Sequence, residues 1–119
     1  MTVKRIVADI HMPDPGVARA FYRDVLGLDV VMDQGWILTF ASDAITSPQI
    51  SFASEGGSGA PVPDLSIEVD DVDQVYAKAH EAGHQITREI CDEPWGVRRF
   101  FVRDPAGKIV NILSHNSAD

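Results

Sequence analysis

The order of structural signals in the first half of the chain is repeated in the second half, and this repeat limits the possible folds most. Asp14 precedes Pro15 as a helix cap, and Gly27 follows 13 positions after Asp14 as a natural helix end. Asp71 and Gly83 mark a second helix in the same way, 12 positions apart. A β-prone run precedes each helix and three short ones follow it. The sequence therefore predicts an α+β protein of two tandem βαβββ modules.

The predicted boundaries divide one domain, residues 1–119, into module one (1–53), a linker (54–63) and module two (64–119). The linker reads Ser-Glu-Gly-Gly-Ser-Gly-Ala-Pro-Val-Pro, and this composition favours a flexible connection. Module one should contain a helix over 14–26 and strands at 4–11, 28–32, 36–41 and 49–53. Module two should contain a helix between Asp71 and Gly83 and strands at 65–69, 85–89, 97–103 and 109–113. Each module leaves one sheet face free of its helix, and two such faces would enclose a cleft.

The first predicted strand alternates two kinds of side chain. Successive side chains of a strand point to opposite faces. The apolar face, which should meet the core, carries Ile6, Ala8 and Ile10. The other face, which suits a pocket, carries Val7, Asp9 and His11.

The last two predicted strands form a hairpin around a defined turn. Asp104 can accept backbone hydrogen bonds, Pro105 presets φ, and Gly107 supplies a positive φ. The strand after the turn is apolar except for Asn111. A lone polar residue in such a strand either pairs within the core or faces a cavity.

Charge and cysteine content restrict the function further. The chain has 18 acidic and 10 basic residues, a net charge of −8 that disfavours nucleic acid and anionic membranes as partners. The same charge either favours cationic small molecules or only keeps the protein in solution. A single cysteine, Cys91, excludes an internal disulfide, and the N-terminus has no apolar signal segment. We expect a cytoplasmic protein.

The chain resembles the vicinal oxygen chelate superfamily, which comprises glyoxalases, bleomycin resistance proteins and extradiol dioxygenases. The segments that carry the resemblance are Phe21–Leu28, Ile67–Val72, Pro94–Gly96 and Arg103–Gly107. The Pro-Trp-Gly element followed by that turn resembles the bleomycin-resistance, drug-sequestering branch most. The resemblance implies a homodimer whose ligand grooves lie near the subunit interface.

Catalytic members of the superfamily hold a divalent metal in the cleft. The resemblance transfers the four ligand positions to Val7, Ser51, Asp64 and Asn111. Valine cannot ligate, serine and asparagine are weak neutral donors, and one carboxylate does not make a metal site. We therefore expect no metal and no cofactor.

The same resemblance indicates which side chains line the cleft. It puts Ile109 and Leu113 on the cleft face with Asn111, and Ser66 and Glu68 with Asp64. In the strand before the turn, Phe101 takes the position of an active-site tyrosine of the dioxygenases, so Arg99 and Phe101 should face inward. Phenylalanine cannot act as acid or base.

Two tryptophans are further candidates for ligand contact. Trp95 in its turn and Trp36 could each stack on a flat ligand or close the end of the core. Trp36, Leu38 and Phe40 share one strand face, although the cleft could instead receive Ile37 and Thr39. Asp9 and His11 could form a displaced metal site together with Asp64 or Glu68. His11 could instead form an acid–base pair with Asp9 or Glu68, but no nucleophile or oxyanion donor completes such a site.

These observations predict a non-catalytic protein that sequesters a natural-product antibiotic and so gives resistance. The expected ligand is cationic or planar and aromatic, such as a bleomycin-type glycopeptide, an enediyne or a mitomycin. The alternative is a metal-dependent glyoxalase or dioxygenase with a divergent metal site. The predicted ligand-binding residues are Asp9, His11, Trp36, Leu38, Phe40, Ser51, Asp64, Glu68, Trp95, Arg99, Phe101, Asn111 and Leu113.

Overall fold

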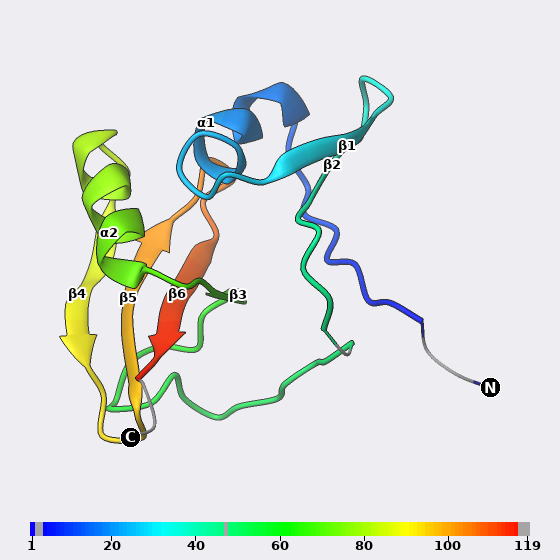
Figure 1. The fold of residues 1–119 in the computed structure, drawn as a ribbon. Helices are drawn as coiled ribbons and strands as arrows, with labels where there is room; N and C mark the ends of the chain where they lie inside the picture. Colours follow the sequence, from blue (N-terminus) through cyan, green and yellow to red (C-terminus); the bar gives the residue numbers. More distant parts are fainter. Residues whose placement is uncertain (2–3, 47, 117–119) are drawn as a thin grey trace.

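A four-stranded sheet covered by one helix forms the second half of the molecule (Figure 1). The computed structural model describes Met1, residues 4–46 and residues 48–116. The second half contains β3 (Leu65–Glu68), α2 (Val72–Glu81), β4 (Ile86–Asp92), β5 (Val97–Arg103) and β6 (Ile109–His115). The strand order is β3-β6-β5-β4, with β3 parallel to β6 and the other pairs antiparallel. All five elements of the predicted second module are present.

The core lies between this sheet and α2. The cap predicted at Asp71 is present, since its side chain accepts a hydrogen bond from the backbone N–H of Gln74 at 3.1 Å. The helix buries Val72 and Ala79 against the sheet. The sheet residues buried on this side are Phe100, Val102, Val110 and Ile112.

The first helix is shorter than predicted and packs on the same core. It consists of a 3₁₀ turn, η1 (Pro15–Ala18), followed by α1 (Arg19–Tyr22), instead of one helix over 14–26. After α1 the chain winds on in wider turns, in which Asp24 N–H bonds to the carbonyl of Arg19 at 3.0 Å. Phe21 and Val25 join the core, whereas Val17 is 49% exposed.

A separate two-stranded hairpin follows the first helix. It pairs β1 (Asp29–Asp33) with β2 (Leu38–Ala41) in antiparallel register, with an irregularity between Val30 and Met32. These two strands were predicted, with slightly different bounds.

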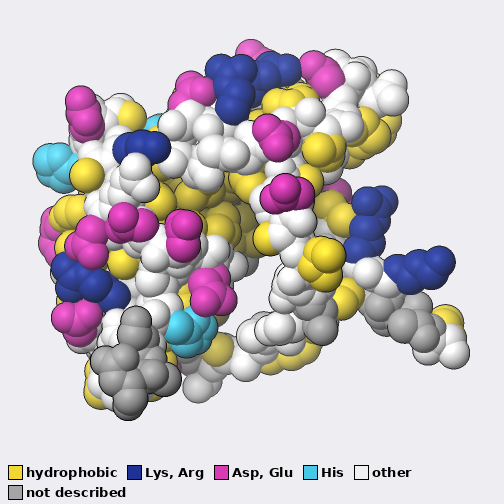
Figure 2. Space-filling view, viewed as in Figure 1, with side chains coloured by type: hydrophobic (Ala, Val, Ile, Leu, Met, Phe, Trp, Pro, Cys, Tyr) yellow, Lys and Arg dark blue, Asp and Glu magenta, His cyan; other side chains and the backbone are white. Residues whose placement is uncertain are grey.

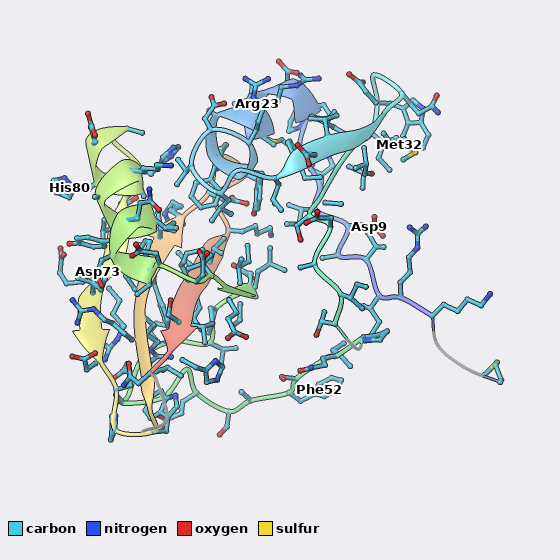
Figure 3. All side chains as sticks on the ribbon, viewed as in Figure 1. Asp9, Arg23, Met32, Phe52, Asp73 and His80 are labelled. Carbon is cyan, nitrogen blue, oxygen red and sulfur yellow. The ribbon has the colours of Figure 1, made fainter. Side chains whose placement is uncertain are left out.

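The predicted strands at 4–11 and 49–53 are not formed. In the structure these residues run as extended chain beyond the hairpin, without a neighbouring strand, as the labelled Asp9 and Phe52 show (Figure 3). Ile6, which should meet the core, is 48% exposed, and Phe52 is 89% exposed. A strand requires a hydrogen-bonded partner, and the described part of this chain brings none to these segments.

The predicted linker contains a compact turn. Gly56 N–H bonds to the carbonyl of Ala60 at 2.7 Å, and Ala60 N–H bonds to that of Gly57 at 3.0 Å. Residues 55–61, called the glycine segment below, therefore have a defined conformation, and Ala60 is buried within it.

Within the described residues, no helix is long and apolar enough to cross a membrane.

Candidate functional site

The sheet face opposite α2 carries the predicted cleft residues of the last hairpin. Because Phe101 pairs with Asn111 and Arg99 with Leu113, these four side chains share one face. Ser66 of β3 is in register with Asn111 and joins them. The structure thus places these residues together, on the side that the core does not use.

Arg99 is the centre of this face and is only 4% exposed. Its Nε donates to a carboxylate oxygen of Glu93 at 2.6 Å. Its two terminal nitrogens donate to the carbonyls of Gly56 at 2.7 Å and Gly57 at 3.2 Å. The guanidinium carbon lies 4.9 Å from the ring centre of Trp95 and 4.8 Å from that of Phe101. Planar guanidinium groups suit this combination of forked donation and stacking.

Glu93 is the buried counter-ion. It also accepts hydrogen bonds from Arg88, at 3.1 Å, and from the Ser58 hydroxyl, at 3.2 Å. Burial alone would raise the pKa of Glu93, but the hydrogen bond and charge of Arg99, with smaller contributions from Ser58 and Arg88, together hold it below its ordinary value. The carboxylate is therefore ionised at neutral pH.

The glycine segment lies directly on Trp95. Gly57 has a φ of 87°, and a Cβ atom built there would come within 2.6 Å of the Trp95 ring. Glycine is required at this position both by the backbone conformation and by the close approach. Side chains therefore hold the glycine segment against the sheet, and the segment does not pair with the sheet as a further strand.

A cavity of about 580 Å³ opens between the glycine segment and the sheet. Its volume falls within the usual range for small-molecule pockets. The segment contributes Ser58, Gly59, Ala60 and Pro61, and the sheet contributes Thr87, Arg88, Glu89, Phe101, Arg103 and Ile109. Of the predicted ligand-binding residues, Phe101 alone is among these, together with Ile109, which was predicted to face the cleft.

Asn111 pairs with the neighbouring strand and does not line the cavity. Its Nδ2 donates to the Ser66 hydroxyl at 3.1 Å, while its Oδ1 is buried without a partner in the described residues. An unsatisfied buried acceptor is costly unless a ligand or water meets it.

The carboxylates of Asp64, just before β3, and of Glu68, in β3, interact with other groups of the chain. Asp64 accepts a hydrogen bond from the backbone N–H of Ile109 at 2.8 Å, and Glu68 lies 2.8 Å from a ring nitrogen of His115. Both are exposed at the sheet edge. They do not line the cavity.

The predicted site residues of the first half lie elsewhere. Asp9, His11 and Ser51 are exposed in the two unpaired segments. Trp36 is 77% exposed beside the hairpin. On β2, Leu38 is half-buried and Phe40 packs near Tyr22, with ring centres 5.7 Å apart. The structure does not bring these residues to the cavity.

The four positions that metal-binding relatives would use do not fit a metal here. Val7 has no donor atom, and Val7 and Ser51 lie in the unpaired segments. The Asp64 carboxylate and the Asn111 amide bond to Ile109 and Ser66 instead. Among the described residues, no group of three or more His, Cys, Asp or Glu side chains could hold a metal ion.

Sequence reasoning predicted Trp95 and Phe101 beside Arg99 but missed its hydrogen-bonding partners and their neighbour Arg88. Glu93, Arg88 and the glycine segment were not predicted as site residues. Two signals pointed to them: an inward-facing arginine requires a buried carboxylate partner, and a run of glycines permits close backbone approach.

The chain belongs to the Glyoxalase/Bleomycin resistance protein/Dioxygenase superfamily, whose family model matches residues 5–112. The α+β architecture agrees with this fold. No curated protein sequence matches the chain at a significant level.

Solved structures of similar fold include proteins of several kinds. TnmS3, an antibiotic binding protein from Streptomyces sp. CB03234, is 22% identical with a TM-score of 0.71, covering 98% of this chain and 99% of TnmS3. TioX from Micromonospora sp. ML1 is 22% identical with a TM-score of 0.64, covering 98% and 99%. A lactoylglutathione lyase from Agrobacterium tumefaciens is 22% identical with a TM-score of 0.61, covering 95% of each chain. At these identities the similarity establishes the fold alone.

Proposed function

We propose that the protein binds and sequesters a natural-product antibiotic without altering it, and so gives resistance. The observation that carries this proposal is the cavity between the glycine segment and the sheet, with Phe101 in its wall. A planar ligand of the enediyne, mitomycin or bleomycin type could stack there on aromatic and guanidinium faces.

The chemistry of the face favours binding over catalysis. Phenylalanine at position 101 offers no proton, and the Glu93 carboxylate is already engaged by Arg99 and Arg88. A general base must reach a proton of the substrate, and Glu93 is held away from that role by its partners. The fold similarity to an antibiotic binding protein supports the same proposal.

We also propose that two copies of the chain form the complete site. Ile50 and Phe52 of the unpaired segments are 69% and 89% exposed, and Ile45, just before the second segment, is 99% exposed. Exposed apolar surface of this kind is typical of an interface. Pairing of these segments with a second copy would bury them. It would also bring Asp9, His11 and Ser51 to a site that one chain leaves without them.

Intrinsic fluorescence can test the binding proposal, because the chain has only two tryptophans. A Trp36→Phe variant retains Trp95 beside the glycine segment, and a Trp95→Phe variant retains Trp36. Titration with bleomycin, mitomycin C and an enediyne should give saturable quenching in Trp36→Phe and little change in Trp95→Phe. Absence of saturable binding for all three would contradict the proposal.

The enzymatic alternative has its own assay. Methylglyoxal and glutathione should show no turnover with the protein in the presence of added Ni²⁺ or Zn²⁺. Expression in a sensitive bacterium should raise the antibiotic concentration needed to stop growth. Turnover in the first assay together with no protection in the second would favour the enzyme.

A further inference from the structure

Strand β4 is irregular at the point where it borders the cavity. Ile86 pairs with Val102 and Arg88 pairs with Phe101, so β4 advances two residues while β5 advances one. A second shift follows between Arg88 and Cys91. Such bulges change the direction of side chains and are frequent beside binding sites.

The two shifts move Arg88 away from the core. In a regular strand Ile86, Arg88 and Ile90 would share one face. Ile86 and Ile90 do pack against the core, whereas Arg88 pairs with Phe101 and lines the cavity. The irregular backbone therefore delivers a guanidinium group to the cavity wall.

The hydrogen bonding of Arg88 is incomplete there. One terminal nitrogen donates to the carboxylate of Glu93, which also accepts a hydrogen bond from Arg99. The Nε atom of Arg88 is buried and has no acceptor among the described residues. A guanidinium donor without an acceptor is costly. The Arg88 side chain is 27% exposed, so the outer donors of its guanidinium group remain within reach of a ligand.

The charges that border the cavity are mainly positive, although the whole protein is acidic. Arg103 donates to the side chain of Gln85 and the carbonyl of Gly107, and within the described residues no carboxylate forms an ion pair with it. The Glu89 carboxylate accepts a hydrogen bond from Tyr76 of α2. The cavity wall itself therefore carries two guanidinium groups, on Arg88 and Arg103, and one carboxylate, on Glu89. The nearby Glu93 carboxylate is shared between Arg88 and Arg99.

We propose that the cavity selects flat ligands that carry an anionic group, and that Arg88 is the residue that recognises this group. The inference rests on the proposed binding function and names the ligand class for that site. The expectation of a cationic ligand came from the net charge of the chain. The side chains at the cavity favour the opposite sign, because guanidinium groups pair with carboxylates and phenolates through charge-assisted hydrogen bonds.

Two acridines of matched shape test the charge preference. Acridine-9-carboxylate is an anion and 9-aminoacridine is a cation at neutral pH, and both have the same three-ring frame. Calorimetric titration at low salt should show at least ten-fold tighter binding of the anion. Arg88→Gln should weaken binding of the anion about ten-fold, which corresponds to about 1.4 kcal/mol, and should leave the cation unchanged. Added NaCl should weaken the anion more than the cation.

Arg98→Gln is the matched control. Arg98 lies on the same sheet but pairs with Asp73 and Asp92 on the helix side, so its loss should leave both affinities unchanged. Thermal unfolding of each variant checks that it is folded, and Arg88→Lys keeps the charge if Arg88→Gln fails to fold.

Equal or tighter binding of 9-aminoacridine would overturn the anionic class and leave the proposed function standing. Anion binding that both Arg88 variants retain in full would overturn the role of Arg88. Binding of neither acridine by folded protein would overturn the inference, and the antibiotic titrations would then decide the proposed function separately.

Discussion

Arg99 is enclosed by partners that each depend on a different property of its side chain. Glu93 requires its charge, the carbonyls of Gly56 and Gly57 require its several donors, and the rings of Trp95 and Phe101 require its flat shape. Lysine shares only the charge. The conformation of the glycine segment therefore depends on this one side chain.

At the scale of single residues, acid should release the glycine segment. The lowered pKa of Glu93 means that the stability from its pairing is fully present above its ordinary value of 4.5. That stability is lost as the pH falls below this value and through the lower pKa of the folded state. The free energy of unfolding in urea, measured from pH 7 down to pH 3, should fall more steeply for the native protein than for Glu93→Gln. Parallel curves would contradict the role assigned to Glu93.

Two glycine substitutions should separate backbone strain from contact with Trp95. Gly57 and Gly59 both have positive φ, 87° and 76°, but only Gly57 lies against another side chain. Alanine costs about 1–2 kcal/mol at either position because of the left-handed backbone. Gly57→Ala must also displace Trp95, so its melting temperature should be lower than that of Gly59→Ala and its fluorescence spectrum should change. Identical behaviour of the two variants would contradict the close approach.

At the scale of elements, the first helix is joined to the last hairpin by one buried hydrogen bond. The Tyr22 hydroxyl donates to Asp104 Oδ2 at 2.7 Å, while Asp104 Oδ1 accepts from the backbone N–H groups of Ala106 and Lys108. Burial and the bond to the Asp104 carboxylate raise the pKa of Tyr22 above its ordinary value of 10.0. The two halves of the chain therefore share a contact outside the apolar core.

Tyr22→Phe should destabilise the protein by about 1.5–3 kcal/mol, the range for a hydrogen bond to a charged group. Tyr76→Phe, which removes an exposed bond to Glu89, is the matched control and should cost less. Because folded Tyr22 keeps its proton, its contribution to stability is present below pH 10 and is lost as the pH rises further. Urea unfolding at neutral and alkaline pH measures both effects. Equal losses in the two variants would contradict the buried contact.

The elements of the second half could be predicted from sequence because their signals are local. The cap at Asp71, the turn at Asp104 and the alternation around Asn111 all act within a few residues, and each predicted feature is present. The irregularity of β4 could not be predicted, because simple alternation groups Arg88 with Ile86 and Ile90. The need to keep a guanidinium out of an apolar core overrides that alternation.

At the scale of the whole molecule, two predicted strands of the first half, at 4–11 and 49–53, fail because they lack a partner. The radius of gyration is 14.7 Å, against about 13.5 Å for a compact chain of this length. Alternation in residues 4–11 indicates a tendency to form a strand, but strand formation requires another chain segment in register. Sequence pattern does not say which molecule provides it. The cavity was missed for a related reason, since its roof is a segment whose composition is typical of linkers.

Oligomeric state tests the proposed second copy. We expect light scattering with size-exclusion chromatography to give a dimer mass, and Phe52→Glu to shift the protein toward monomer by placing charge in the interface. Val17→Glu is the matched control, because Val17 is also an exposed apolar residue, 49% exposed, but lies on η1 and not in the unpaired segments. A monomer at micromolar concentration, or dissociation by both variants, would contradict the proposal.

Acidic and apolar side chains occupy different regions of the molecular surface. Figure 2 shows acidic side chains over both the part that carries α2 and the part that carries α1 and the β1–β2 hairpin, and hydrophobic side chains in the hollow between these two parts. The acidic surface keeps copies apart except where apolar segments are exposed. Association of two copies should therefore strengthen with added salt, whereas binding of the acridine anion should weaken.

The support of the glycine segment also limits how such a protein can evolve. Gly57, Glu93 and Arg99 depend on one another, so a mutation at any one of them would be tolerated only with compensating changes at the others. Thr87 lies on the bulge, is exposed and lines the cavity, so it can change without disturbing that support. Adaptation to a new ligand should therefore begin at positions such as Thr87, and the three supporting residues should be the last to vary.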